Sequence, residues 1–319
     1  MYRLFVLLSV LICLPLPTAA AQSAIEQRLI LDNLRFRLLD TWQELHILDQ
    51  ALAADQDSGQ LRHHLQSTHQ AVNVVRREVG QELTGMPVDQ NRMTPEDAAL
   101  LRLNVRHIRG LDGHLGRYMA HQAAYLRAHA ANDAEARQAA ILALTAARIE
   151  MLRDTGEFML RAFVGNDSFS SHSNAIDAAF TAADIAMIEQ SRSGVPWDAT
   201  HGLAFRGALQ EARLALYRAE AARADIDPVV PREAPDLHMD LLAKRRALLE
   251  FQAARLSIYG GYGLHFWDSD GRAWPADAID WAAVAELDRR GARLWQNAGP
   301  VFRDVHNVEM KIYQISVQD

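Results

Sequence analysis

The sequence predicts an all-α protein in which long antiparallel amphipathic helices form a bundle. Alanine, leucine, arginine and glutamate, all strong helix formers, dominate the composition. Apolar residues recur every three or four positions over long stretches, and short segments of Gly, Pro and Asp separate these stretches. With 49% hydrophobic and 23% charged residues, the 319-residue chain has enough apolar surface for a sizeable core, which excludes a disordered protein.

The first 21 residues, MYRLFVLLSVLICLPLPTAAA, have the pattern of a signal peptide. Arg3 precedes an apolar stretch from Leu4 to Leu16, and three alanines ending at Ala21 suit cleavage there or after Ser23. An uncleaved membrane anchor is the alternative. Cleavage removes the only cysteine, so we expect a mature chain without disulfides or Cys-ligated metals. No later run approaches about 18 apolar residues, so we expect no membrane span in the mature chain and a periplasmic or secreted location.

The first two helices are predicted from leucine and valine spacing. Residues 24–54 carry apolar residues at a 3-4 spacing typical of a coiled coil, at Leu31, Leu34, Leu38, Leu45, Leu48 and Leu52. The turn residues 55–59 interrupt the pattern, and a second apolar face follows from Leu61 to Leu83. The short connection predicts that these two helices pack antiparallel.

The third helix has the clearest predicted start in the chain. Thr94 is a cap residue, Pro95 suits the first helical position, and two acidic residues follow at the positive end of the helix dipole. We expect this helix to run to about Ala131 and a fourth to cover 134–164. Further helices are expected over residues 174–191, 199–224, 236–258, 277–296 and 300–315.

The loop at 165–173 is the best predicted domain boundary. It divides an N-terminal four-helix bundle, residues 22–164, from a C-terminal helical region, residues 174–319. One continuous helical domain is the alternative.

Charge and motifs exclude several functions. A net charge of -7 without a dense basic block argues against nucleic-acid binding, which depends on neutralising phosphates. The sequence has no G-x-S-x-G, P-loop or dinucleotide fingerprint, and nothing selects one carboxylate pair as an acid–base couple. We therefore expect a scaffold, adaptor or sensor-like module that acts by binding rather than catalysis, through a protein partner or self-association of helices, and without a cofactor.

A Gly/Trp-rich segment at 259–275 is predicted to be an irregular or β-hairpin insertion, because three glycines in four residues argue against a continuing helix. Its aromatic and acidic residues suit a small ligand, either a sugar or an organic cation. The candidate ligand-binding residues are Tyr262, Phe266, Trp267, Asp268, Asp270 and Trp274. An aromatic plug that closes the end of the bundle is the alternative interpretation.

A histidine stripe on the third helix is the second candidate site. His107, His114 and His121 lie seven residues apart, which is about 10.5 Å along a helix, so one helix alone cannot bring them to a metal. A metal or haem site, and a metal-dependent enzyme, would need partners such as His64 or His69 from the second helix. The alternatives are a half-exposed amphipathic border and a pH-sensitive packing seam.

Overall fold

The computed structural model of the chain describes residues 19–53, 58–86, 94–161, 168–225, 235–296 and 298–318. The described residues form a bundle of α-helices, which confirms the predicted all-α class. The helices are α2 (Ala19–Ala53), α3 (Ser58–Gly85), α4 (Pro95–Ala130), α5 (Ala134–Arg161), α6 (Ser168–Ser193), α7 (Thr200–Ala221), α8 (Pro235–Phe266), α9 (Trp281–Gln296) and α10 (Ala298–Gln318). Among the described residues, no helix is both long enough and apolar enough to cross a membrane.

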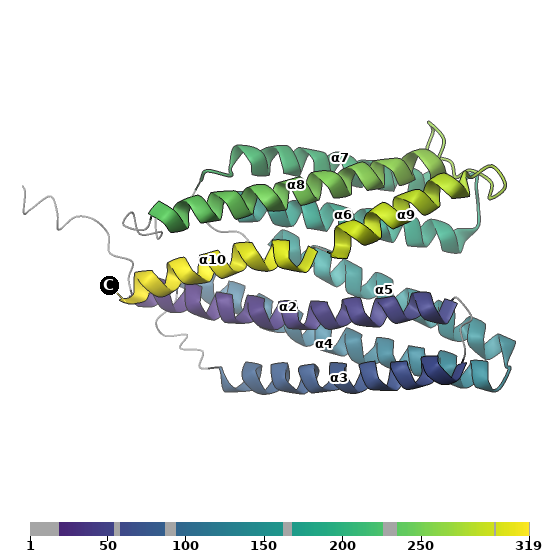
Figure 1. Cartoon of the computed structure of the whole chain (residues 1–319), viewed down its shortest axis with the longest axis horizontal. Coiled ribbons are helices and arrows are strands. Elements are labelled where there is room, and N and C mark those ends of the chain that lie inside the picture. The colour runs from purple at the N-terminus through teal and green to yellow at the C-terminus, as the bar shows by residue number, and fades with distance from the viewer. Residues whose placement is uncertain are drawn as a thin grey trace, which may run out of the picture.

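The helices lie along the long axis of the molecule, and most neighbours in sequence run antiparallel (Figure 1). Helices α2 to α5 form one side of the bundle, and α6 to α9 form the other. Helix α5 packs against α6, while α10 packs against α8 and touches α2, so these contacts join the two sides. The predicted division into two domains stays a prediction.

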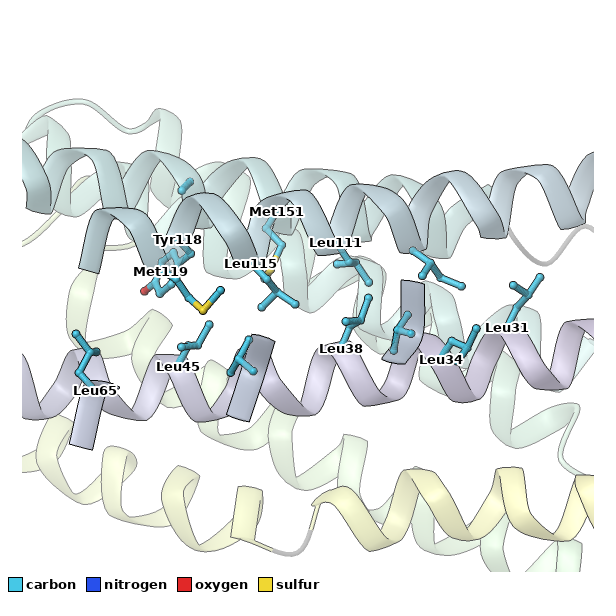
Figure 2. Close-up of a cluster of buried hydrophobic side chains, with 14 of the residues drawn as sticks. Leu31, Leu34, Leu38, Leu45, Leu65, Leu111, Leu115, Tyr118, Met119 and Met151 are labelled. Atoms are coloured by element: carbon cyan, nitrogen blue, oxygen red, sulfur yellow. The ribbon is translucent and has the colours of Figure 1, made fainter. Parts of the chain in front are cut away.

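The core of the first side comes from the leucine pattern of α2. Leu31, Leu34, Leu38 and Leu45 are almost completely buried. Figure 2 shows these leucines facing apolar side chains of α4 and α5 across a shared core. A second core gathers apolar residues of α6, α7, α8 and α10. Small alanines such as Ala183 and Ala212 are buried on α6 and α7, the pair of helices in closest contact, where they permit close packing.

The cap of α4 is formed as predicted. The Thr94 hydroxyl accepts a hydrogen bond from the backbone N–H of Asp97 at 3.1 Å, and Pro95 is the first helical residue. Helix α6, in contrast, begins at Ser168, inside the expected linker 165–173, of which residues 165–167 lie outside the described residues. The Ser-rich segment is helical because Phe169 is buried in the second core, with the Arg245 guanidinium 4.4 Å from its ring centre.

The prediction that glycines end α8 near residue 258 is wrong. The helix runs through Gly260, Gly261 and Gly263 to Phe266. A Cβ atom at Gly261 would lie 2.7 Å from Leu287 of α9, and one at Gly263 would lie 3.1 Å from the Phe205 ring of α7. These glycines therefore allow close helix packing. Beyond Phe266, where an irregular or β-hairpin insertion was expected, the described residues show no hairpin but an isolated antiparallel bridge between Trp267 and Ala273.

A buried polar layer that the sequence did not predict lies between α6 and α8. Arg255 and Gln252 of α8 both donate hydrogen bonds to the same carboxylate oxygen of Asp177, at 2.9 and 3.0 Å. The Arg255 guanidinium also stacks 4.0 Å from the Phe180 ring centre. Burial raises the pKa of Asp177, and the neighbouring Arg255 opposes that shift. The layer therefore holds a buried ion pair within the apolar core.

Candidate functional site

The predicted aromatic segment lies at one end of the bundle, where α6 leads into α7 and α8 leads into α9 (Figure 1). Trp267, the first residue after α8, is 3% exposed and belongs to a third core cluster with Phe205 of α7. The two ring centres are 4.6 Å apart. Trp267 therefore faces the protein interior, as the plug interpretation expects, rather than solvent.

The tyrosines of the segment are held by carboxylates of neighbouring helices. The Tyr259 hydroxyl donates to Asp184 of α6 at 2.6 Å, and the Tyr262 hydroxyl donates to Asp288 of α9 at 2.7 Å. Burial raises the pKa of both tyrosines, and the adjacent carboxylates add to that shift. Phe266 stacks on Tyr262 with ring centres 5.8 Å apart. These bonds tie the end of α8 to α6 and α9.

The two candidate aspartates are used within the turn itself. The Asp268 carboxylate accepts hydrogen bonds from the backbone N–H groups of Asp270 and Arg272, each at 2.9 Å. Asp270 forms an ion pair with Arg272 at 2.8 Å. Arg206 of α7 donates to the carbonyl oxygens of Asp268 and Ser269, and so fastens the turn to α7.

Gly202 and Gly271 mark the closest approach between this turn and α7. A Cβ atom at Gly202 would lie 2.1 Å from the Gly271 carbonyl oxygen and 2.6 Å from Cδ1 of Trp267. Gly271 has a φ of +88°, a conformation that favours glycine. The turn is therefore a tightly packed closure of the bundle end.

Large apolar side chains are nevertheless exposed on this closed end. We call them the end surface, and they are Trp197, Leu203, Leu264, Trp274 and Trp281. Leu203 lies directly against Gly271, and the backbone N–H of Trp274 donates to the Phe266 carbonyl. The indole N–H of Trp281 donates to the Ala276 carbonyl at 2.9 Å, and its ring packs near Phe266. Of the predicted candidates, only Trp274 belongs to this surface.

The charges around the end surface are predominantly negative. Its segments, residues 195–206 and 264–281, carry two arginines and five aspartates, namely Asp198, Asp268, Asp270, Asp277 and Asp280. Both arginines, Arg206 and Arg272, are already bonded within the turn. The Asp280 carboxylate caps α9 by accepting from the backbone N–H groups of Ala282 and Ala283. The segments that carry the end surface therefore hold more carboxylates than cations.

His107 and His114 of the histidine stripe contact different neighbours. His107 is buried and stacks on Phe158 with ring centres 4.0 Å apart. His114 Nε2 lies 3.1 Å from an Asp154 oxygen, while its Nδ1 accepts from Arg117 at 2.8 Å, and His121 is half-buried. His69 reaches Gln122 of α4 at 2.9 Å, and His64 is exposed. Within the described part of the chain, no group of three or more His, Cys, Asp or Glu residues is placed to hold a metal.

His107 gives the bundle a pH-dependent stability. Burial lowers the pKa of His107 to about 3, and the nearby Arg35 cation acts in the same direction. Its Nε2 atom has no hydrogen-bond partner among the described residues. Because an unfolded histidine has a pKa of about 6.5, protons bind preferentially to the unfolded chain as the pH falls below that value. The buried neutral histidine therefore costs stability on the acid side.

We expect His107→Phe, which keeps an aromatic ring on Phe158, to remove about 2 kcal/mol of the stability lost between about pH 6.5 and 5. Urea unfolding across this pH range measures the difference. The matched variant Phe158→Leu should lower stability at every pH and keep the wild-type pH dependence. Equal pH dependence in wild type and His107→Phe would contradict the assignment.

Comparisons of the chain with protein-family models, curated proteins and solved structures find no match.

Proposed function

We propose that the chain is an exported, periplasmic helical-bundle protein that acts by binding a partner, as a scaffold, adaptor or sensor-like module, rather than by catalysis. The observation that carries this proposal is the end surface, where Trp197, Trp274 and Trp281 are exposed on a closed and heavily bonded end of the bundle. Exposed tryptophans are costly in water, and tryptophans are typical energetic centres of protein interfaces.

The hydrogen bonds that fix the exposed tryptophans support a binding function. Trp281 is held by the Ala276 carbonyl, and the Trp274 backbone is bonded to the end of α8. A surface that is ordered before it meets its partner loses little conformational entropy on association. The excess of aspartates in these segments favours a partner protein that presents arginine or lysine side chains, which can also stack on the indole rings.

A small organic cation is the second candidate ligand. It is favoured by Trp274, which is 42% exposed on a turn that also carries Asp270. Trp267, the other tryptophan expected to contact such a ligand, faces the core instead. Titration of tryptophan fluorescence with quaternary amines and with sugars tests this candidate. A saturable change that Trp274→Ala abolishes would favour it over a protein partner.

Site-specific crosslinking in the native host tests the protein-partner proposal. A photoreactive p-benzoylphenylalanine at position 274 or 281 should capture one defined protein, through a segment that contains arginine or lysine. Tyr217, which is 76% exposed on α7 away from the turn, is the matched control position and should capture none of it. Equal capture at positions 217 and 274, or capture through an acidic segment, would contradict the proposal.

Export has its own test. The protein isolated from the periplasmic fraction of its host should begin at residue 22 or 24, after removal of the predicted signal peptide. Recovery of the protein in the cytoplasmic fraction with residues 1–21 intact would contradict export while leaving the binding surface untouched.

A further inference from the structure

Helix α7, at the outer edge of the bundle (Figure 1), has two faces with the spacing of a coiled coil. The inner face packs on α6 and α8, and its buried residues are Phe205, Ala208, Ala212, Ala215 and Ala219. The outer face repeats the same alternation of three and four residues, and its exposed residues are Leu203, Gly207, Gln210, Leu214, Tyr217 and Ala221. This spacing is typical of a helix that packs lengthwise against another helix.

We call Gln210, Leu214, Tyr217 and Ala221 the outer stripe. Leu214 is 41% exposed and Tyr217 is 76% exposed, so two large side chains with apolar surface stand side by side in water. Over residues 210–221 the stripe is about 17 Å long, at 1.5 Å per residue. A second helix laid along it would cover both side chains.

Two acidic and two basic side chains border the outer stripe, all of them exposed. Glu211 and Arg218 lie along one border, and Arg213 and Glu220 lie along the other. Within the part of the chain that the structure describes, Glu211, Arg213 and Arg218 have no ion-pair partner. Glu220 has only the neighbouring Arg223, at 3.6 Å. In a chain of net charge -7, this face has balanced charges and does not repel a copy of itself.

We propose that the outer stripe pairs with the same stripe of a second copy of this chain, with the two α7 helices antiparallel about a two-fold axis between residues 215 and 216. In this register Leu214 packs on Tyr217 of the second copy, and Gln210 lies opposite Ala221. The two-fold axis repeats each contact, so the face is complementary to itself.

The bordering charges support this register. In an antiparallel pair of helices, side chains on the same border of the stripe face each other across the axis. Glu211 therefore faces Arg218 of the second copy along one border. Arg213 faces Glu220 of the second copy along the other. Each ion pair occurs twice in the dimer, and every bordering charge meets its opposite.

Other arrangements of the two helices bring like charges together. A parallel pair sets Arg213 against Arg218 of the second copy. A shift of the antiparallel register by seven residues in one direction sets Glu211 against Glu211, and a shift in the other direction sets Arg218 against Arg218. Repulsion of this kind is what fixes register and orientation in coiled coils. The order of the charges therefore selects the antiparallel register centred between residues 215 and 216.

The pairing is separate from the end surface. It uses neither Trp274 nor Trp281, and α7 begins next to the end surface at Leu203. Because the two α7 helices run in opposite directions, the dimer carries its two end surfaces at opposite ends.

Sedimentation equilibrium of the full mature chain tests the pairing. The wild type should be monomeric at about 5 µM and largely dimeric at about 1 mM, because an interface this short supports only weak association. Arg213→Glu sets two acids opposite each other at both ends of the contact and should weaken dimerisation about tenfold. Combining Arg213→Glu with Glu220→Arg exchanges the two charges and should restore wild-type association.

Arg246→Glu is the matched control for net charge. Arg246 is 68% exposed on α8, away from the outer stripe, so this variant should dimerise as the wild type does. A monomer at about 1 mM, or equal weakening by Arg246→Glu and Arg213→Glu, would overturn the proposal. So would unchanged association of Arg213→Glu, or stronger association, which a parallel pair requires.

Photocrosslinking of the purified protein tests the register. A p-benzoylphenylalanine at position 217 should form a covalent dimer that is attached at residues 213–215 of the second copy. Attachment at position 217 of the second copy would indicate a parallel pair and overturn the proposal. The product is the chain itself, whereas positions 274 and 281 should capture a different protein. The pairing and the proposed function can therefore fail independently.

Discussion

Replacing Gly202 with alanine is expected to destabilise the protein by about 3 kcal/mol or more and to disorder the aromatic end of the bundle. The new methyl group would lie 2.1 Å from the Gly271 carbonyl oxygen and 2.6 Å from Trp267, and neither neighbour can move easily. Gly271 is itself packed against Leu203, and Trp267 is buried on Phe205. Urea unfolding, together with the near-ultraviolet circular dichroism of the tryptophans, measures the effect.

Gly207→Ala provides the matched control for this prediction. Gly207 lies on the same helix, and a Cβ atom there meets nothing within 4 Å. Alanine at this position should raise stability by up to about 1 kcal/mol, because it restricts the unfolded chain and favours the helix. Equal effects of the two substitutions would show that α7 and the 267–280 turn are not in close contact.

The second large effect is expected from Arg255→Met, which should cost about 3–5 kcal/mol. The substitution leaves the Asp177 carboxylate buried without its cation, and it also removes the guanidinium from the face of Phe180. The double variant Asp177→Asn with Arg255→Met should recover part of the loss, since no uncompensated charge then remains in the core. Denaturant unfolding of both single variants and the double variant gives the coupling free energy.

Arg246 supplies the comparison on the same helix. Its side chain is 68% exposed and pairs with Glu250, so Arg246→Met should change stability by no more than about 0.5 kcal/mol. A loss as large for Arg246→Met as for Arg255→Met, or a double variant with fully additive losses, would contradict the buried ion pair.

Most of the fold follows from the sequence because helix periodicity is a local signal. The 3-4 spacing of Leu31, Leu34 and Leu38 predicts one buried face for α2, and the structure buries all three. Thr94 and Pro95 predict the start of α4 because a helix cap requires only neighbouring residues.

The errors arise where distant contacts override local preference. Three glycines lower the helix propensity at the end of α8. The helix nevertheless continues, because Leu287 and Phe205 pack into the space that a side chain at Gly261 or Gly263 would occupy. The serines after residue 167 predict a loop, yet Phe169 is anchored in a core that also includes residues of α7, α8 and α10. Neither of these two packing contacts can be predicted from the local sequence.

The candidate site was predictable only in part. Tyr262, Phe266 and Trp267 are brought together as the aromatic segment predicts, but the burial of Trp267 depends on its contact with α7. Trp197 lies between α6 and α7, and Trp281 begins α9 84 residues later. Only the fold brings the α6–α7 and α8–α9 connections to one end of the bundle (Figure 1). The ion pair between Asp177 and Arg255, which are 78 residues apart, likewise could not be predicted from the spacing of residues in the sequence.

Hydrogen exchange at the 267–280 turn tests the central claim, which is that this segment is a folded closure that presents tryptophans rather than a loose loop over a pocket. The Asp268 N–H donates to the Arg272 carbonyl, and the Trp274 N–H donates to the Phe266 carbonyl, each at 2.9 Å. Both amides should be protected to within about 2 kcal/mol of the free energy of global unfolding. Exchange of both amides at the rate of an unstructured peptide would contradict the claim.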